Sequence, residues 1–363
     1  MASVWNRGIF VSIYGESHSK AIGVVVDNFP AGIKIDFDEV RKDLQRRSPL
    51  KKRAGSTQRM EDDEFEILSG IYDGYTSGAP ISAVIYNKSF NSSDYFKIKD
   101  LLRPSHADYT AKVRYDGFND PRGAGHCSGR LTATIVFVGS ICKMALRMKK
   151  IRSFAHIFSL FDVKDVSFDE IDIDFSEFEK AKEKELTFLD DYKIKKAAKL
   201  LNAAKKEGDS IGAVVECGVF GVPAGIGSPM FDGIENYVSN AVFAIPAVKG
   251  VEFGKGFSFS NFKGSEVNDE FYIEKGKIKT KTNNNGGILG GISTGMPIVF
   301  RVVFKPTPTI FKKQQTVNIN SKQNDEIVCT GFHDCCVAVR GVFVVEAAAN
   351  LAILSQLIYQ GRF

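Results

Sequence analysis

The segment Gly15-Glu16-Ser17-His18 gathers groups that can bind an anion or move a proton. It follows Phe10–Tyr14, an apolar run typical of a strand. A loop at the end of a strand offers backbone N–H groups, a hydroxyl and an imidazole at one point, which suits an anionic group or proton transfer. The alternative is an ordinary turn with an exposed histidine.

A second histidine lies in Arg103-Pro104-Ser105-His106, and Asp108 follows it. The Arg103 guanidinium can pair with a phosphate or a carboxylate in forked geometry. The same residues could begin a helix, with Ser105 as the N-cap and Asp108 near the positive end of the helix dipole. The two interpretations are compatible. Near the C-terminus, His333-Asp334 could likewise move a proton or cap the helix that follows.

Two glycine-rich stretches, 122–130 and 283–295, could surround a phosphate. The first leads into an apolar helical run, and glycines before a helix N-terminus let a phosphate approach backbone N–H groups. The second leads into a strand that closes with Lys305-Pro306-Thr307-Pro308-Thr309, whose lysine and threonines can hold a cofactor phosphate. Neither stretch has the spacing of a P-loop or a dinucleotide motif, and the glycines could serve turns alone.

The elements that would position these segments occur twice. A β-branched run closed by Pro-Ala-Gly appears at 22–33 and again at 211–226. An Ile-Leu-x-Gly-Ile stretch, with Gly-x-Pro-Ile after it, appears at 67–81 and again at 288–298. We therefore predict one α+β domain over residues 1–363, a β-α-β sandwich whose related halves span about 8–150 and 209–360 and whose antiparallel sheets enclose helices.

Helices are expected at matching places in both halves. The first helix of each half should begin at Asp36 and at Asp232. Leu131–Arg147 and Val342–Leu357 are apolar on most sides, so they should be buried between the sheets. Between the halves, about 160–208, we expect an inserted acidic loop and then a helix from Asp190 to Lys206. The polar stretch 261–285 should be an ordered excursion or a mobile lid.

Composition places the chain among folded cytoplasmic proteins. Its 363 residues are 44% hydrophobic and 25% charged. The N-terminus lacks the regions of a signal peptide, and the longest apolar stretch, Leu131–Leu146, is interrupted by polar residues and too short to cross a bilayer. The six cysteines have no metal-ligand spacing, which predicts free thiols in a reducing compartment and no metal site.

The net charge of +5 includes a basic cluster, formed by Arg46, Arg47, Lys51, Lys52, Arg53 and Arg59. Such a cluster can bind nucleic acid, a membrane surface or a small polyanion, or it can be a solvated loop. A nucleic-acid site would interleave aromatic residues with the basic ones, and this cluster contains no aromatic residue. Nucleic-acid binding would also leave the two glycine-rich stretches unexplained, so we favour a small polyanion.

Together these motifs resemble the chorismate synthase family. The first matches are Gly-Glu-Ser-His at 15–18, Arg-Pro-Ser-His-Ala-Asp-Tyr-Thr at 103–110 and Arg-Gly-x-Gly-x-x-Ser-Gly-Arg at 122–130. Further matches are Ala-Val-Lys-Gly-Val-Glu-x-Gly at 247–254, Ile-Leu-Gly-Gly-Ile at 288–292, Lys-Pro-Thr-Pro at 305–308 and Gly-x-His-Asp-x-Cys at 331–336. Their order and rough spacing hold over nearly the whole chain.

The resemblance implies a lyase with a β-α-β sandwich fold, usually assembled as a homotetramer. It implies an anti-1,4 elimination of phosphate from 5-enolpyruvylshikimate 3-phosphate to give chorismate, the last step of the shikimate pathway to aromatic amino acids. The reaction has no net redox change but requires reduced FMN, which would donate electron density as phosphate leaves. Some members reduce their own flavin with NADPH, and the sequence leaves open whether this chain does.

Individual roles are also implied by position. The expected catalytic residues are His18, His106, Ser17, Ser128 and Asp334. The expected FMN contacts are His126, Cys127, Ser128, Ala247, Gly290, Lys305, Thr307 and Thr309. The expected substrate contacts are Arg41, Arg46, Arg47, Arg103 and Arg130, and Arg47 and Arg53 match positions linked with NADPH.

The chain departs from the family at two places. Members usually have Arg-Ser-Ser where this chain has His126-Cys127-Ser128, and Arg where it has Phe332. Because charge-assisted hydrogen bonds to a phosphate would be lost, weaker FMN binding is expected, unless the Phe332 ring stacks on the flavin.

Overall fold

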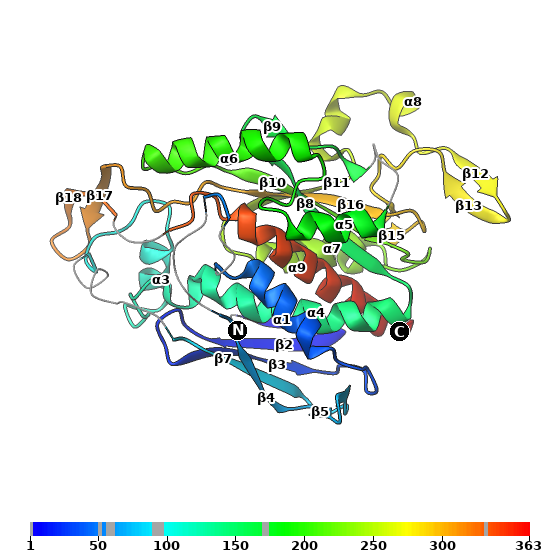
Figure 1. Cartoon of the computed structure of the whole chain (residues 1–363), viewed down its shortest axis with the longest axis horizontal. Coiled ribbons are helices and arrows are strands. Elements are labelled where there is room, and N and C mark those ends of the chain that lie inside the picture. The colour runs from blue at the N-terminus through cyan, green and yellow to red at the C-terminus, as the bar shows by residue number, and fades with distance from the viewer. Residues whose placement is uncertain (1–2, 50–52, 56–61, 89–97, 169–173, 330–332) are drawn as a thin grey trace.

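Two five-stranded antiparallel sheets enclose a layer of helices in the computed structural model (Figure 1), which describes residues 3–49, 53–55, 62–88, 98–168, 174–329 and 333–363. The first sheet has the order β1-β2-β3-β7-β4 and contains β1 (Val4–Arg7), β2 (Ile9–Gly15), β3 (Ala21–Asp27), β7 (Ile81–Tyr86) and β4 (Phe65–Ser69). The second has the order β11-β16-β10-β8-β9 and contains β11 (Val248–Phe253), β16 (Ile298–Phe304), β10 (Ala213–Phe220), β8 (Arg152–Leu160) and β9 (Val163–Lys164).

The helical layer contains α1 (Phe37–Arg47), α4 (Thr132–Met148), α7 (Ile234–Phe243) and α9 (Ala338–Tyr359). Gly139 of α4 lets the two long helices meet closely, because a Cβ there would lie 2.4 Å from Ala347 Cα of α9. Gly129–Met148 and α9 are long and apolar enough to cross a membrane, yet 83% and 94% of their most apolar windows are buried inside the protein. They are core helices, as the sequence indicated.

The two sheets repeat one arrangement. The strand order β2-β3-β7-β4 in the first sheet has its counterpart in β8-β10-β16-β11 of the second, and α1 and α7 follow the equivalent strands β3 and β10. The α+β class is therefore confirmed. We propose that the halves arose by duplication within one domain. We also propose that the second half begins with β8 rather than at about residue 209, so that residues 160–208 interrupt it instead of separating the halves.

Smaller elements surround this sandwich. Two short hairpins in equivalent places are β5 (Ile71–Tyr72) with β6 (Tyr75–Thr76), and β14 (Ile288–Leu289) with β15 (Ile292–Ser293). The stretch 261–285 is an ordered excursion that contains α8 (Gly264–Val267) and a hairpin of β12 (Phe271–Glu274) and β13 (Lys277–Thr280), which projects from the sandwich (Figure 1). The others are α3 (Asp108–Arg114), α5 (Phe175–Glu183), α6 (Asp191–Lys206), β17 (Gln314–Asn318) and β18 (Gln323–Ile327).

Some helix starts were predicted correctly from the sequence and others were not. Asp36 caps α1 by accepting from the backbone N–H groups of the first turn, and Asp190 caps α6 in the same way. The expectation for Asp232 is wrong: it ends a 3₁₀ turn, and Gly233 is the N-cap of α7. The acidic insertion is not simply a loop before α6, because it also contains α5, whose buried Phe178 packs in an aromatic cluster.

Two further caps that the sequence offered as alternatives are wrong. Ser105 has φ +60° and does not cap α3, whose N-cap is Ala107, although α3 does begin at Asp108, near the positive end of the helix dipole. Helix α9 begins at Ala338, so His333 and Asp334 lie before the helix rather than at its cap. The segments 103–107 and 333–334 therefore lie outside helices, and residues of both contribute to the site described below.

Candidate functional site

A cavity of about 490 Å³ opens where α4 and α9 begin and where α7 and β16 end. Its walls come from Arg47 and Pro49 and from residues within 17–18, 103–107, 123–132, 243–249, 304–309 and 333–344. Small-molecule sites usually have volumes of roughly 300–1,000 Å³. Because helix N-termini carry partial positive charge, the ends of α4 and α9 favour an anionic occupant.

Ser17 and His18 lie just after β2, and both are buried at the cavity wall. Ser17 Oγ donates to Arg122 O at 3.2 Å and lies 2.9 Å from His18 Nδ1. Since the hydroxyl proton is directed to the carbonyl, His18 Nδ1–H donates to Oγ, and Nε2 is the proton-accepting nitrogen of the neutral ring. Gly123 has φ +67°, and a Cβ there would lie 2.4 Å from Ser17 Oγ, so only glycine lets its loop pack on this pair.

The His106 ring is fixed through both nitrogens. Nδ1 is 3.1 Å from Pro104 O and Nε2 is 2.7 Å from Thr309 Oγ1. A carbonyl only accepts, so Nδ1 carries the proton and Nε2 accepts from the threonine. Burial and the neighbouring Arg103 guanidinium lower the pKa of His106 to about 4. The ring is therefore neutral at pH 7 in the free protein.

Arg47, Arg103 and Arg130 all reach the cavity, and each is held by a carboxylate that is not part of its wall. Arg103 forms a fork with Asp108, with Nε to Oδ2 at 2.8 Å and Nη2 to Oδ1 at 2.6 Å. Arg47 and Arg130 share Asp63. These pairs keep three guanidiniums in place without filling the cavity.

The Lys305–Thr309 loop lines the cavity as the sequence suggested. Lys305 Nζ donates to Ser105 O at 2.6 Å, and burial together with Lys249 lowers its pKa. Thr307 Oγ1 is buried and has no hydrogen-bond partner among the described residues. Ala247 lies in the cavity wall with φ +73°, in the left-handed region. The other expected residues in the wall are Cys127, Ser128, Thr309 and Asp334.

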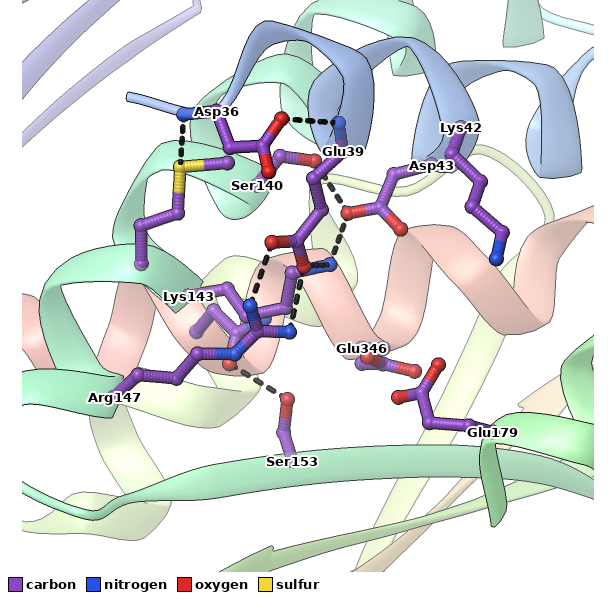
Figure 2. Close-up of polar contacts among 12 residues, drawn as sticks. Asp36, Glu39, Lys42, Asp43, Ser140, Lys143, Arg147, Ser153, Glu179 and Glu346 are labelled. Atoms are coloured by element: carbon purple, nitrogen blue, oxygen red, sulfur yellow. Dashed lines mark hydrogen bonds and ion pairs between the residues drawn. The ribbon is translucent and has the colours of Figure 1, made fainter. Parts of the chain in front are cut away.

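Two arginines expected to bind substrate do not line the cavity. Arg46 is buried and bonds Glu183 Oε1 at 2.7 Å, which ties α1 to α5. It belongs to a polar network in which Asp43 faces Ser140 and Lys143 of α4 (Figure 2). Arg41 is half exposed and pairs with Asp38 at 2.8 Å. Substrate binding by Arg41 or Arg46 therefore has no support in the geometry of this chain.

Three expected cofactor contacts also lie outside the cavity wall. The Arg53 guanidinium carbon lies 4.4 Å from the centre of the Phe343 ring. His126 Nδ1 donates to Gly15 O at 2.6 Å, so its ring holds the Ser17–His18 loop instead of facing the cavity. Gly290 occupies the turn between β14 and β15 with φ +61°.

Sequence reasoning missed Lys249 and Arg340, which also line the cavity, as does His333 of the His333-Asp334 pair that the sequence had singled out. Lys249 lies two residues after Ala247, within the family-like motif at 247–254. That motif could have indicated Lys249 as a site residue. Arg340 Nε donates to Asp334 Oδ2 at 3.2 Å. This contact spans the start of α9, and no local sequence pattern indicates it.

Some earlier expectations concern residues beyond the described ranges. Phe332, Lys51, Lys52 and Arg59 are among them. In the described ranges, the cysteines are free and no cluster of His, Cys, Asp or Glu could hold a metal ion. Nucleic-acid binding loses support because Arg46, Arg47 and Arg53 of the basic cluster are buried.

Known proteins match this chain over nearly its whole length. The family model for chorismate synthase matches residues 9–358. The chorismate synthase of Pyrococcus abyssi is 42% identical, covering 98% of this chain and 97% of its own length. That of Phocaeicola vulgatus is 44% identical, covering 94% and 93%. A crystal structure of a chorismate synthase matches with a TM-score of 0.77 at 28% identity, over 97% of this chain and 92% of its own. The chain belongs to the chorismate synthase family of lyases.

Proposed function

We propose that the chain converts 5-enolpyruvylshikimate 3-phosphate into chorismate and phosphate, with reduced FMN in the same cavity, as the last step of the shikimate pathway in the cytoplasm. The observation that carries this proposal is the convergence of His18, His106 and three arginines on one cavity, in a chain of this family. The substrate has one phosphate and two carboxylates, and FMN adds another phosphate. Guanidiniums are well suited to such groups.

The residues present fit FMN. Thr307 Oγ1 is a buried hydroxyl without a partner among the described residues, and Thr307 and Lys305 both line the cavity. We propose that Lys305, Thr307 and Thr309 hold the FMN phosphate, with Ala247, Cys127 and Ser128 beside the cofactor. When bound, reduced FMN would lend electron density for departure of the substrate phosphate.

The protein's own groups would then bind and move protons. We propose that Arg47, Arg103 and Arg130 bind the substrate anions and that His106 protonates the departing phosphate. An arriving dianion favours the charged imidazole and so opposes the effect of burial on His106. His18 would transfer a second proton at the flavin, with Ser17 orienting its ring and Ser128 assisting. Asp334, which Arg340 holds, would move the proton that leaves the substrate.

Activity is expected only with reduced FMN. The test uses 5-enolpyruvylshikimate 3-phosphate under anaerobic conditions, with photoreduced FMN or with oxidised FMN and no reductant, and follows both chorismate and phosphate release. Equal turnover with oxidised FMN would contradict the proposed mechanism. If the chain binds both ligands but is inactive with reduced FMN, it is a flavoprotein of another activity or an inactive relative.

A reductant other than NADPH should be needed to bring FMN to its reduced form. Of the two arginines linked with NADPH, only Arg47 lines the cavity. Arg53 instead packs on Phe343. We expect NADPH with oxidised FMN to give little product anaerobically, while dithionite restores full rates. Sustained turnover with NADPH as the sole reductant would show that the chain reduces its own flavin.

We further propose the homotetramer usual in the family, acting on a small molecule without a nucleic-acid or membrane partner. Mass measurement by light scattering distinguishes a tetramer from a single 40.0 kDa chain.

A further inference from the structure

Asp63 joins two arginines of the cavity wall through a single carboxylate. Its Oδ2 lies 2.6 Å from Arg47 Nη2 and 3.1 Å from Arg47 Nε. Its Oδ1 bonds Arg130 Nη1. The Asp63 side chain is fully buried and is not part of the cavity wall, whereas both arginines are. Asp63 can therefore act on a ligand only through these arginines.

Three separate elements meet at this carboxylate. Arg47 is the last residue of α1, Arg130 lies in the 3₁₀ turn before α4, and Asp63 precedes the edge strand β4. Each arginine has a second anchor: Arg47 Nη1 donates to Thr132 Oγ1 at 3.1 Å, and Arg130 Nε donates to Asn87 Oδ1 at 2.9 Å. The two guanidiniums are thus fixed in direction as well as in place.

The backbone of Asp63 is itself in an unfavourable conformation. Its φ of +53° lies in the left-handed region, which costs free energy for a residue with a Cβ. Such a conformation persists when surrounding contacts determine it. The carboxylate of Asp63 makes such contacts with the two arginines.

Charge gives a reason for the arrangement. Burial, Arg340 and Arg130 lower the pKa of Arg47, and Asp63 opposes that change. Two buried guanidiniums without a carboxylate would repel each other and be poorly solvated. One carboxylate between two arginines leaves one net positive charge for an arriving anion.

We propose that Asp63 is a positioning residue that orients Arg47 and Arg130 as a paired receptor for an anionic group of the substrate. The identity of that substrate rests on the proposed function, whereas the pairing of the arginines does not. Since Asp63 acts through the arginines, its loss should impair binding more than the chemical step.

The test compares Asp63→Asn, Arg130→Gln and the double variant. With photoreduced FMN and 5-enolpyruvylshikimate 3-phosphate, Asp63→Asn should raise KM by roughly 10- to 100-fold and lower kcat less, because charge-assisted contacts lose their geometry. In the double variant the KM should rise by less than the product of the two single effects, since without Arg130 the carboxylate has only Arg47 left to orient. A KM for Asp63→Asn within twofold of the parent, or effects that multiply in the double variant, would overturn the proposal.

Glu216→Gln is the matched control. Glu216 is also a fully buried carboxylate bonded to an arginine, at 2.8 Å from Arg301 Nε, but neither residue lines the cavity. It should lower thermal stability without changing KM. If KM rises equally in this control, the effect of Asp63→Asn reflects general loss of structure and the proposal fails.

A second variant covers the case in which Asp63→Asn does not fold. Asp63→Glu keeps the charge but moves it by one methylene, so it should fold and still raise KM; a parental KM would overturn the proposal.

If the parent itself is inactive, the proposed function fails, and inorganic phosphate replaces the substrate as the probe. Calorimetry should then show that Asp63→Asn and Asp63→Glu bind phosphate more weakly than the parent does. Unchanged phosphate binding would overturn the proposal that Asp63 positions the two arginines.

Discussion

Replacing His106 with alanine is expected to slow turnover by roughly 10²- to 10⁴-fold, the usual loss when a positioned acid or base is removed. The ring lines the cavity, and its contacts with Pro104 O and Thr309 Oγ1 fix which nitrogen can take up a proton. The Thr309 hydroxyl, which bonds Nε2, cannot replace it as a proton carrier at neutral pH, because a hydroxyl is far less basic than an imidazole. The measurement is kcat and kcat/KM from phosphate release with reduced FMN.

Proton uptake distinguishes a catalytic role for His106 from a structural one. Burial and Arg103 lower its pKa to about 4, so the free protein holds the ring neutral at pH 7.5. If the substrate phosphate raises that pKa, binding in the presence of oxidised FMN should take up protons, seen as a binding heat that depends on the buffer. His106→Gln should lose this uptake. A near-normal rate for His106→Ala would leave the ring a structural role only.

Stability should change with pH for the same reason. The unfolded chain protonates His106 near pH ~6.5, whereas the folded protein does so only near pH 4. Between these values the unfolded state binds more protons, so stability falls as pH falls through this window, by up to roughly 3 kcal/mol at pH 4. Urea unfolding of the parent and of His106→Gln at several pH values between 7.5 and 4.5 isolates this contribution, which the variant should lack.

The fold could be read from the sequence where apolar spacing dominates. Helices α4 and α9 are buried along most of their length, so their apolar character was sufficient. Helix α5 was missed because its charged residues outnumber the few apolar residues that pack against the sheet. Phe178 stacks on Phe154 of β8 with ring centroids 4.5 Å apart, and only the folded sheet provides that partner.

The sequence predicted which residue types form the site, but not which way each side chain points. Arg46 and Arg47 are neighbours in one basic cluster, yet successive residues of an α-helix point about 100° apart. Only Arg47 can therefore face the cavity, and Arg46 turns to Glu183 of the insertion. Asp63 was missed for a related reason, because its role depends on two arginines that come from elsewhere in the chain.

Replacing His18 with alanine is expected to slow turnover by a comparable factor, roughly 10²–10⁴. His18 differs from His106 in its support, because its Nδ1–H donates to the Ser17 hydroxyl, 2.9 Å away, and that hydroxyl donates to Arg122 O. This chain of bonds leaves Nε2 as the basic nitrogen. Ser17→Ala removes only the orienting bond, so its loss should be roughly tenfold or less.

The double variant tests whether Ser17 acts through His18. If the serine only orients the ring, Ser17→Ala with His18→Ala should be no slower than His18→Ala alone, because residues that act as a unit are not additive. Rates that multiply would mean that Ser17 handles a proton itself. The fold of each variant is checked by its thermal midpoint, since both side chains are buried against Gly123, whose loop has no room for a larger residue. A parental rate for His18→Ala with an unchanged midpoint would show that the buried imidazole only packs against that loop, and proton transfer at this end of the cavity would then need another group.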